Sequence, residues 1–200
     1  MCFSLVGSAQ TDSANGFLSE SEKEAAKHID LLKSGTLVVR LSSGEKKLAA
    51  LKLRGTQEQM NEYMLEVHIE NKAIIDAFKE KFDFCEVRYT YDKDIEHLLR
   101  NPSNALLIDT ATLEVDSSLS MDVEKPFYIL GTSRIYFETQ NASSSGFVIM
   151  DKNLNYLEDP FPYYVMSFEG MGPMARTPFI MVEALMKKLT DFYATYGSKY

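Results

Sequence analysis

The sequence is poor in the residues that build disulfide frameworks and zinc centres. It contains two cysteines, three histidines and no tryptophan in 200 residues. Cys2 falls within the first ten residues, which we interpret below as the remnant of a leader. Cys85 is then the only cysteine of the predicted domain, without a partner for an internal disulfide or a Cys-x-x-Cys redox motif. The histidines at 28, 68 and 97 have no His or Cys at the short spacing that zinc sites use. We therefore expect no metal centre of this type and no bound cofactor.

Long apolar runs, glycine-rich phosphate loops and an excess of positive charge are also missing. No stretch reaches the roughly 18 consecutive apolar residues of a membrane-spanning helix. The chain has neither a Gly-x-x-x-x-Gly-Lys loop nor a Gly-x-Ser-x-Gly nucleophile elbow. Its 21 Lys and Arg against 29 Asp and Glu give a net charge of -8, which argues against phosphate-rich partners. The composition predicts no nucleic acid and no membrane span, and leaves a protein partner and the oligomeric state open.

What the chain does contain is typical of a folded domain. Hydrophobic residues make up 45% and charged residues 25% of the sequence, as in average globular proteins. A chain of 200 residues fits one domain of ordinary to large size, which can build its own core without a disulfide or metal. We find no internal repeat and no linker, so residues 17–200 are predicted to form a single domain.

The first ten residues are similar to the end of a secretory leader. Phe3, Leu5 and Val6 are apolar, and residues 8–10 are a small-residue stretch of the kind that signal peptidase cuts after. The apolar part is shorter than that of a full leader, so residues 1–10 are predicted to be its remnant and residues 11–16 a polar tether. An ordinary frayed terminus is the alternative. If the leader interpretation holds, the protein is exported, to the periplasm or the extracellular space.

The first half of the chain predicts alternating strands and helices. Capping boxes at Ser19 and Thr56 begin helices that run to about residues 33 and 81, and a short helix is expected over residues 45–53. Apolar strands are expected over residues 36–41, 84–91 and 105–108. This order favours parallel strands joined by helical crossovers.

The second half changes character after a polar stretch at residues 110–125. A long strand is expected over residues 126–138 with a bulge or bend at Gly131, then a loop over 140–146, and a strand over 147–150 that pairs with it as an antiparallel hairpin. Another strand follows at 163–166, and Thr177 with Pro178 begins the last helix. The predicted fold class is α/β: a mixed sheet with a parallel β-α-β half and an antiparallel hairpin, flanked by helices, in thioredoxin-like or flavodoxin-like order.

Charged side chains at the predicted strand ends are the first candidate site. Ligands of open α/β sheets bind at the carboxyl ends of strands, and here those ends carry Arg40, Asp92, Asp109 and Asp151. Three converging carboxylates would suit Mg²⁺ or Ca²⁺, and the arginine would clamp an anion. The alternative is structural, because aspartate commonly follows a strand as a helix cap or turn former.

An aromatic segment stiffened by two prolines, residues 159–165, is the second candidate site. Phe161, Tyr163 and Tyr164 offer broad amphipathic surfaces that suit recognition of a partner. The alternative is that these rings cover an edge of the core where the chain passes from a loop into a strand.

Three strings, residues 34–41, 77–85 and 159–165, resemble a group of uncharacterised exported proteins of Gram-negative bacteria. The resemblance extends from about residue 31 to residue 193, and it implies export and a single domain. The leading functional hypothesis is therefore an exported, non-catalytic binding or interaction domain. The first alternative is a metal-dependent hydrolase or phosphoryl-handling enzyme that uses the strand-end aspartates. The second alternative is a thioredoxin-like scaffold without redox activity.

Overall fold

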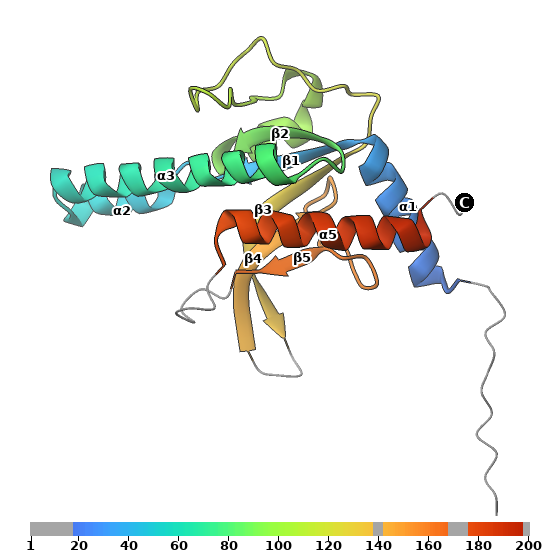
Figure 1. Cartoon of the computed structure of the whole chain (residues 1–200). Helices are drawn as coiled ribbons and strands as arrows, with labels where there is room; N and C mark the ends of the chain where they lie inside the picture. Colours follow the sequence, from blue (N-terminus) through green and yellow to red (C-terminus); the bar gives the residue numbers. More distant parts are fainter. Residues whose placement is uncertain (1–17, 138–141, 168–175, 198–200) are drawn as a thin grey trace, which may run out of the picture.

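A strand buried on both faces, β1 (Thr36–Leu41), lies inside the sheet of this protein. The computed structural model describes residues 18–137, 142–167 and 176–197, and these form a five-stranded mixed sheet flanked by helices (Figure 1). The near-continuous apolar run of β1 reflects this double burial, as expected for a parallel strand with cover on both sides. The α/β fold predicted from the sequence is confirmed.

The sheet has a parallel half and an antiparallel half. β1 pairs in parallel with β2 on one side and with β3 on the other, and β3 then pairs with β4, and β4 with β5, in antiparallel. The strand order 2-1-3-4-5 is that of flavodoxin-like sheets, but the reversed β4 distinguishes it from an all-parallel sheet. The remaining strands are β2 (Glu86–Tyr91), β3 (Phe127–Phe137), β4 (Ala142–Met150) and β5 (Tyr164–Met166).

Three helices cover the first face of the sheet: α1 (Glu20–Ser34), α3 (Gln57–Lys81) and α5 (Pro178–Tyr196). Figure 1 shows α3 and α5 lying side by side across this face, with α1 packed against α5. Both capping boxes and the Thr177 cap form as the sequence predicts. The main core forms here, where Leu37, Val39 and Leu41 of β1 meet the buried stripes of the helices.

The second face has a thinner cover. It consists of α4 (Ile95–Arg100), the 3-10 turns η1 (Asp92–Asp94) and η2 (Pro102–Asn104), and the irregular segment 105–125. Leu98 and Leu107 pack on Val38 and Ile129 in a second cluster of buried side chains. The crossovers from β1 to β2 and from β2 to β3 thus lie on opposite faces of the sheet.

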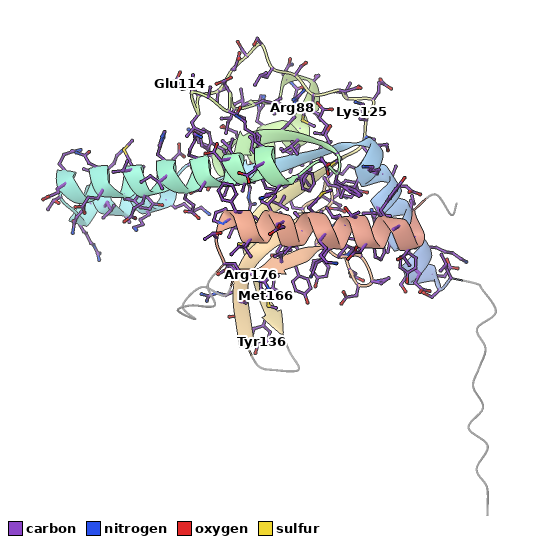
Figure 2. All side chains as sticks on the ribbon, viewed as in Figure 1. Arg88, Glu114, Lys125, Tyr136, Met166 and Arg176 are labelled. Atoms are coloured by element: carbon purple, nitrogen blue, oxygen red, sulfur yellow. The ribbon has the colours of Figure 1, made fainter. Side chains whose placement is uncertain are left out.

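Two parts of the molecule extend beyond the layered core. α2 (Glu45–Arg54) and the first half of α3 project on one side, and the β3–β4 hairpin projects on another, where Figure 2 labels Tyr136. The helical projection exposes large apolar side chains, namely Leu53, Met64, Leu65 and Ile69. Within the described residues, no helix has both the length and the hydropathy of a membrane span.

The structure corrects three sequence predictions. Residues 105–108 form no regular strand: Ile108 makes an isolated bridge with Val115, because the chain turns back at Asp109. Residues 142–146, part of the loop expected over 140–146, belong to β4, which begins at Ala142. Gly131 causes no bulge, as the β3–β4 register runs through it without interruption. The predicted leader remnant at 1–10 and tether at 11–16 lie outside the described residues.

Truncation of Leu98 tests the second core. This side chain is fully buried under the thin cover, so we expect Leu98→Ala to cost about 2–5 kcal/mol of unfolding free energy in urea titrations. Leu53→Ala is the matched control: its side chain is 84% exposed and the change should stay within about 0.5 kcal/mol. Equal effects of the two substitutions would contradict the two-core arrangement.

Candidate functional site

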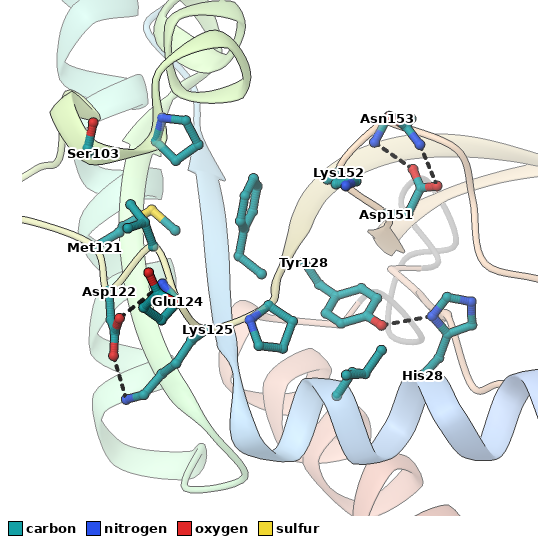
Figure 3. A pocket seen from close by; sticks show the side chains of 15 residues that line it. His28, Ser103, Met121, Asp122, Glu124, Lys125, Tyr128, Asp151, Lys152 and Asn153 are labelled. Atoms are coloured by element: carbon teal, nitrogen blue, oxygen red, sulfur yellow. Dashed lines mark hydrogen bonds and ion pairs between the residues drawn. The ribbon is translucent and has the colours of Figure 1, made fainter.

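A cavity of about 790 Å³ opens beside the start of β3. Its walls come from α1, from the beginning of β3, and from segments 102–103, 121–126 and 151–153 (Figure 3). Apolar side chains make up much of the wall, including Leu31, Met121 and Phe127. The cavity therefore combines an apolar body with the few polar groups described next.

A hydrogen-bonded pair from α1 and β3 lies in the wall of the cavity. His28 Nδ1 is 2.7 Å from the hydroxyl oxygen of Tyr128, and Figure 3 shows the two side chains pointing toward one another. His28 Nε2 is 3.4 Å from Oε1 of Glu24, one helical turn earlier. His28 lies at the border of the α1 stripe that faces the core, which brings its ring to the start of the central strand β3.

The environment of the pair determines which atoms donate. Burial lowers the pKa of His28 despite the opposing effect of Glu24, so the ring is neutral at pH 7. A neutral imidazole has one donor and one acceptor nitrogen, and a carboxylate only accepts. We therefore assign the ring proton to Nε2, facing Glu24, and the acceptor role to Nδ1. The Tyr128 hydroxyl then donates to Nδ1, and burial raises the pKa of Tyr128, which keeps that proton in place.

Asp151 adds an ionised carboxylate to the same wall. Burial alone would raise its pKa, but hydrogen bonds from the backbone N–H groups of Asn155 and Asn153, both at 2.8 Å to Oδ1, outweigh burial and lower the pKa. Its other oxygen, Oδ2, accepts from the side-chain amides of the same two residues at 3.2 and 3.4 Å. Asp151 is therefore ionised and held in a fixed position.

Negative charge continues beyond the cavity. A smaller hollow of about 230 Å³ shares His28 and Asp151 with it and adds Glu24, Glu158 and Asp159. On the opposite wall, Lys125 lies 3.8 Å from Asp122 and 3.5 Å from Glu86, so its charge is already paired. This end of the sheet thus presents the acceptors Tyr128 and Asp151 and further acidic groups to a bound molecule, together with the ammonium group of Lys152.

The strand-end aspartates do not form the site that the sequence suggested. Asp92 follows the parallel strand β2, and Asp109 follows the isolated bridge at Ile108, but Asp151 follows β4, which runs antiparallel and ends at the opposite end of the sheet. Asp92 accepts from the backbone N–H groups of Ser43 and Lys93, and Asp109 caps the turn at residues 111–112. Over the part of the chain that the structure describes, no group of three His, Cys, Asp or Glu side chains could hold a metal.

The aromatic segment is mostly part of the core. Phe161 is 1% exposed and packs edge-on against His28 and Phe192, so its ring belongs to the core rather than to the surface. Tyr163 and Tyr164 are partly buried against one another, and Lys188 lies over the Tyr164 ring. Phe161 thus fits the alternative that the rings of this segment cover an edge of the core.

Sequence reasoning missed the central pair of the site, His28 and Tyr128. These two residues are 100 positions apart, so only the fold brings them together. The one local signal is the spacing of Glu24 and His28, four residues apart beside an apolar helical stripe. Such spacing is common on ordinary helices and does not identify a site.

Comparison with protein-family models, with curated proteins and with solved structures found no match to this chain. The structure itself therefore gives the class: a single α/β domain with a largely apolar cavity, whose wall holds Tyr128 and Asp151 as acceptors and Lys125 and Lys152 as cations.

The neutral state of His28 predicts a pH dependence of stability. Because the folded-state pKa lies below the unfolded value, the unfolded chain binds more protons as the pH falls, and unfolding becomes easier. We expect the free energy of unfolding, measured in urea, to decrease between pH 7.5 and pH 5.5. His28→Asn, which keeps an acceptor near Tyr128, should show a smaller decrease. His97→Asn is the control and should keep the wild-type slope; an unchanged slope in His28→Asn would contradict burial of a neutral imidazole.

Proposed function

We propose that this protein is a non-catalytic binding domain for an organic molecule with an apolar body and a cationic or hydrogen-bond-donating head. The observation that carries the proposal is the cavity beside β3, with Tyr128 and Asp151 in its wall. Its volume of about 790 Å³ lies within the range of roughly 300–1,000 Å³ found for small-molecule sites.

The polar groups of the wall support a donor-bearing head. Since the Tyr128 proton is directed to His28, the remaining lone pairs of its oxygen are available to accept. Asp151 is ionised and accepts only. An ammonium group meets both of these, whereas a carboxylate would meet acceptors and negative charge. The acidic hollow next to the cavity adds to this preference.

The states of the reactive side chains support binding rather than catalysis. Nδ1 of His28 is hydrogen-bonded to Tyr128, Nε2 lies 3.4 Å from Glu24, and the raised pKa of Tyr128 makes it a poor acid. Burial raises the pKa of the Cys85 thiol to about 12, which keeps it protonated and unreactive at neutral pH. None of these groups is tuned toward pH 7, as general acids and bases usually are.

Export is a further part of the proposal, and it rests on the composition of residues 3–10 alone. We expect the protein isolated from its natural source to begin at Gln10 or Thr11 when the amino terminus is determined by mass spectrometry. Recovery of a chain that retains residues 1–9 from the cytoplasmic fraction would contradict export.

The lack of tryptophan allows a direct test of ligand binding. Phe127→Trp places the only tryptophan of the chain in the cavity wall, so its emission reports occupancy. We expect 4-phenylbutylamine to change this emission in a saturable way, and 4-phenylbutanoate, which has a carboxylate in place of the amine, to bind more weakly. Tyr136→Trp, on a residue that is 61% exposed on the hairpin, is the control and should not respond.

Two variants in the Phe127→Trp background assign the head-group contacts. Tyr128→Phe removes one acceptor and should weaken amine binding by about 2- to 10-fold, as expected for one neutral hydrogen bond. Asp151→Asn should reduce the preference for amine over acid. Stronger binding of 4-phenylbutanoate, or an equal response of the Tyr136→Trp control, would refute the proposal.

A further inference from the structure

A second polar feature lies on the second face of the sheet, near the end of β1. Arg40 is the only charged residue of β1, and its side chain lies on the second face, as Val38 does. The guanidinium rests on β3 at Gly131: a Cβ built there would lie 2.8 Å from Nη2 and 3.0 Å from both Cζ and Nε of Arg40. The absence of a side chain at residue 131 is what lets the guanidinium lie against the strand.

The conformation of the backbone gives no other reason for this glycine. Gly131 is not among the described residues with a positive φ, and its pairing with Val148 continues the regular register. A glycine inside a strand weakens the strand, and it often marks a place where another group approaches the backbone closely. Here that group is the guanidinium of Arg40, which occupies the space that a side chain at residue 131 would take.

Arg40 is also partly buried without a partner. Among the described residues it takes part in no hydrogen bond and no ion pair, whereas exposed Arg100 and half-exposed Arg88 each have a carboxylate oxygen within 3 Å. A charged group that loses part of its hydration normally gains a partner in exchange. The five N–H donors of Arg40 therefore remain available to an acceptor from outside the chain.

The side chain of Arg40 lines a groove of about 910 Å³. Ser133 and Tyr156 line the groove and share a hydrogen bond between their hydroxyl groups, and Asn155 adds an amide. The groove begins where the pairing of β1 with β3 ends, after Val39 and Leu130. The crossover that leaves β1 and the crossover that enters β3 lie on opposite faces of the sheet at this strand pair. In sheets of this strand order, ligands bind at that switch point, outside the carboxyl ends of the strands.

We propose that this groove binds an oxyanion, a carboxylate or a phosphate group, and that Arg40 is the principal residue that contacts the anion. The planar guanidinium offers two parallel N–H donors to such a group, and the Ser133–Tyr156 hydroxyl pair supplies a further donor. Glu158 also lines the groove, and its negative charge opposes the anion and limits the affinity. The groove shares Tyr156, Leu157 and Glu158 with the acidic hollow beside the cavity, and Arg40 gives it the opposite preference for charge.

Thermal unfolding in sodium phosphate, and separately in sodium acetate, tests the proposal against sodium chloride at equal ionic strength. A ligand that binds only the folded state raises Tm, and at tenfold above Kd we expect a rise of roughly 3–6 °C that saturates. Arg40→Gln should abolish this rise, and Arg40→Lys, which keeps the charge without the fork, should reduce it. Glu158→Gln should lower the apparent Kd. Arg134→Gln, an equal change of charge at an exposed position of β3, should behave as wild type.

Gly131→Ala adds a geometric test, because the new methyl group occupies the place of the guanidinium. The rise in Tm with the anion should be lost relative to the variant's own value in chloride, which separates anion binding from any loss of basal stability. A response to phosphate alone would assign the site to phosphate groups, and a response to both anions would assign it to oxyanions generally. A rise that is equal in wild type and Arg40→Gln, or no rise with either anion, would overturn the proposal.

Discussion

Burial of β1 on both faces is the constraint on which the rest of the structure depends. Leu37, Val38 and Val39 are at most 1% exposed, so two separate layers must cover this one strand. Both neighbours of β1 run parallel to it, which requires long crossovers, and α3 and α4 with segment 105–125 provide them on opposite faces. The cavity lies at the start of the β1–β3 pair, and the Arg40 groove lies where that pair ends.

The two ends of this strand pair differ in electrostatic character. The cavity at the start presents Tyr128, Asp151 and an adjacent acidic hollow as acceptors, alongside Lys125 and Lys152. The groove at the far end presents Arg40 and hydroxyl groups, which donate. The two places adjoin through Tyr156, Leu157 and Glu158, which line both the acidic hollow and the groove, and they differ in the charged group that each adds: Asp151 in the cavity and Arg40 in the groove.

The sequence predicts local structure better than it predicts the site. The capping boxes at Ser19 and Thr56 depend on neighbouring residues, so the helix starts could be recognised directly. The three aspartates do not converge as expected, because the direction of β4 decides where Asp151 lies. Strand direction is a tertiary property that the local sequence does not specify. The bulge or bend expected at Gly131 does not form, because the group that needs the space there is Arg40, which comes from a different strand. His28 and Tyr128 meet only after the sheet forms.

The state of His28 is the most direct test of this account, because the polarity of the cavity depends on it. Long-range ¹H–¹⁵N NMR of the histidine ring distinguishes the neutral tautomers from one another and from the charged form. The account predicts a neutral ring at pH 7 with the proton on Nε2, so that Tyr128 donates to Nδ1 and accepts from a ligand. A protonated ring, or a proton on Nδ1, would reverse the role of Tyr128 and contradict the preference for a donor-bearing head.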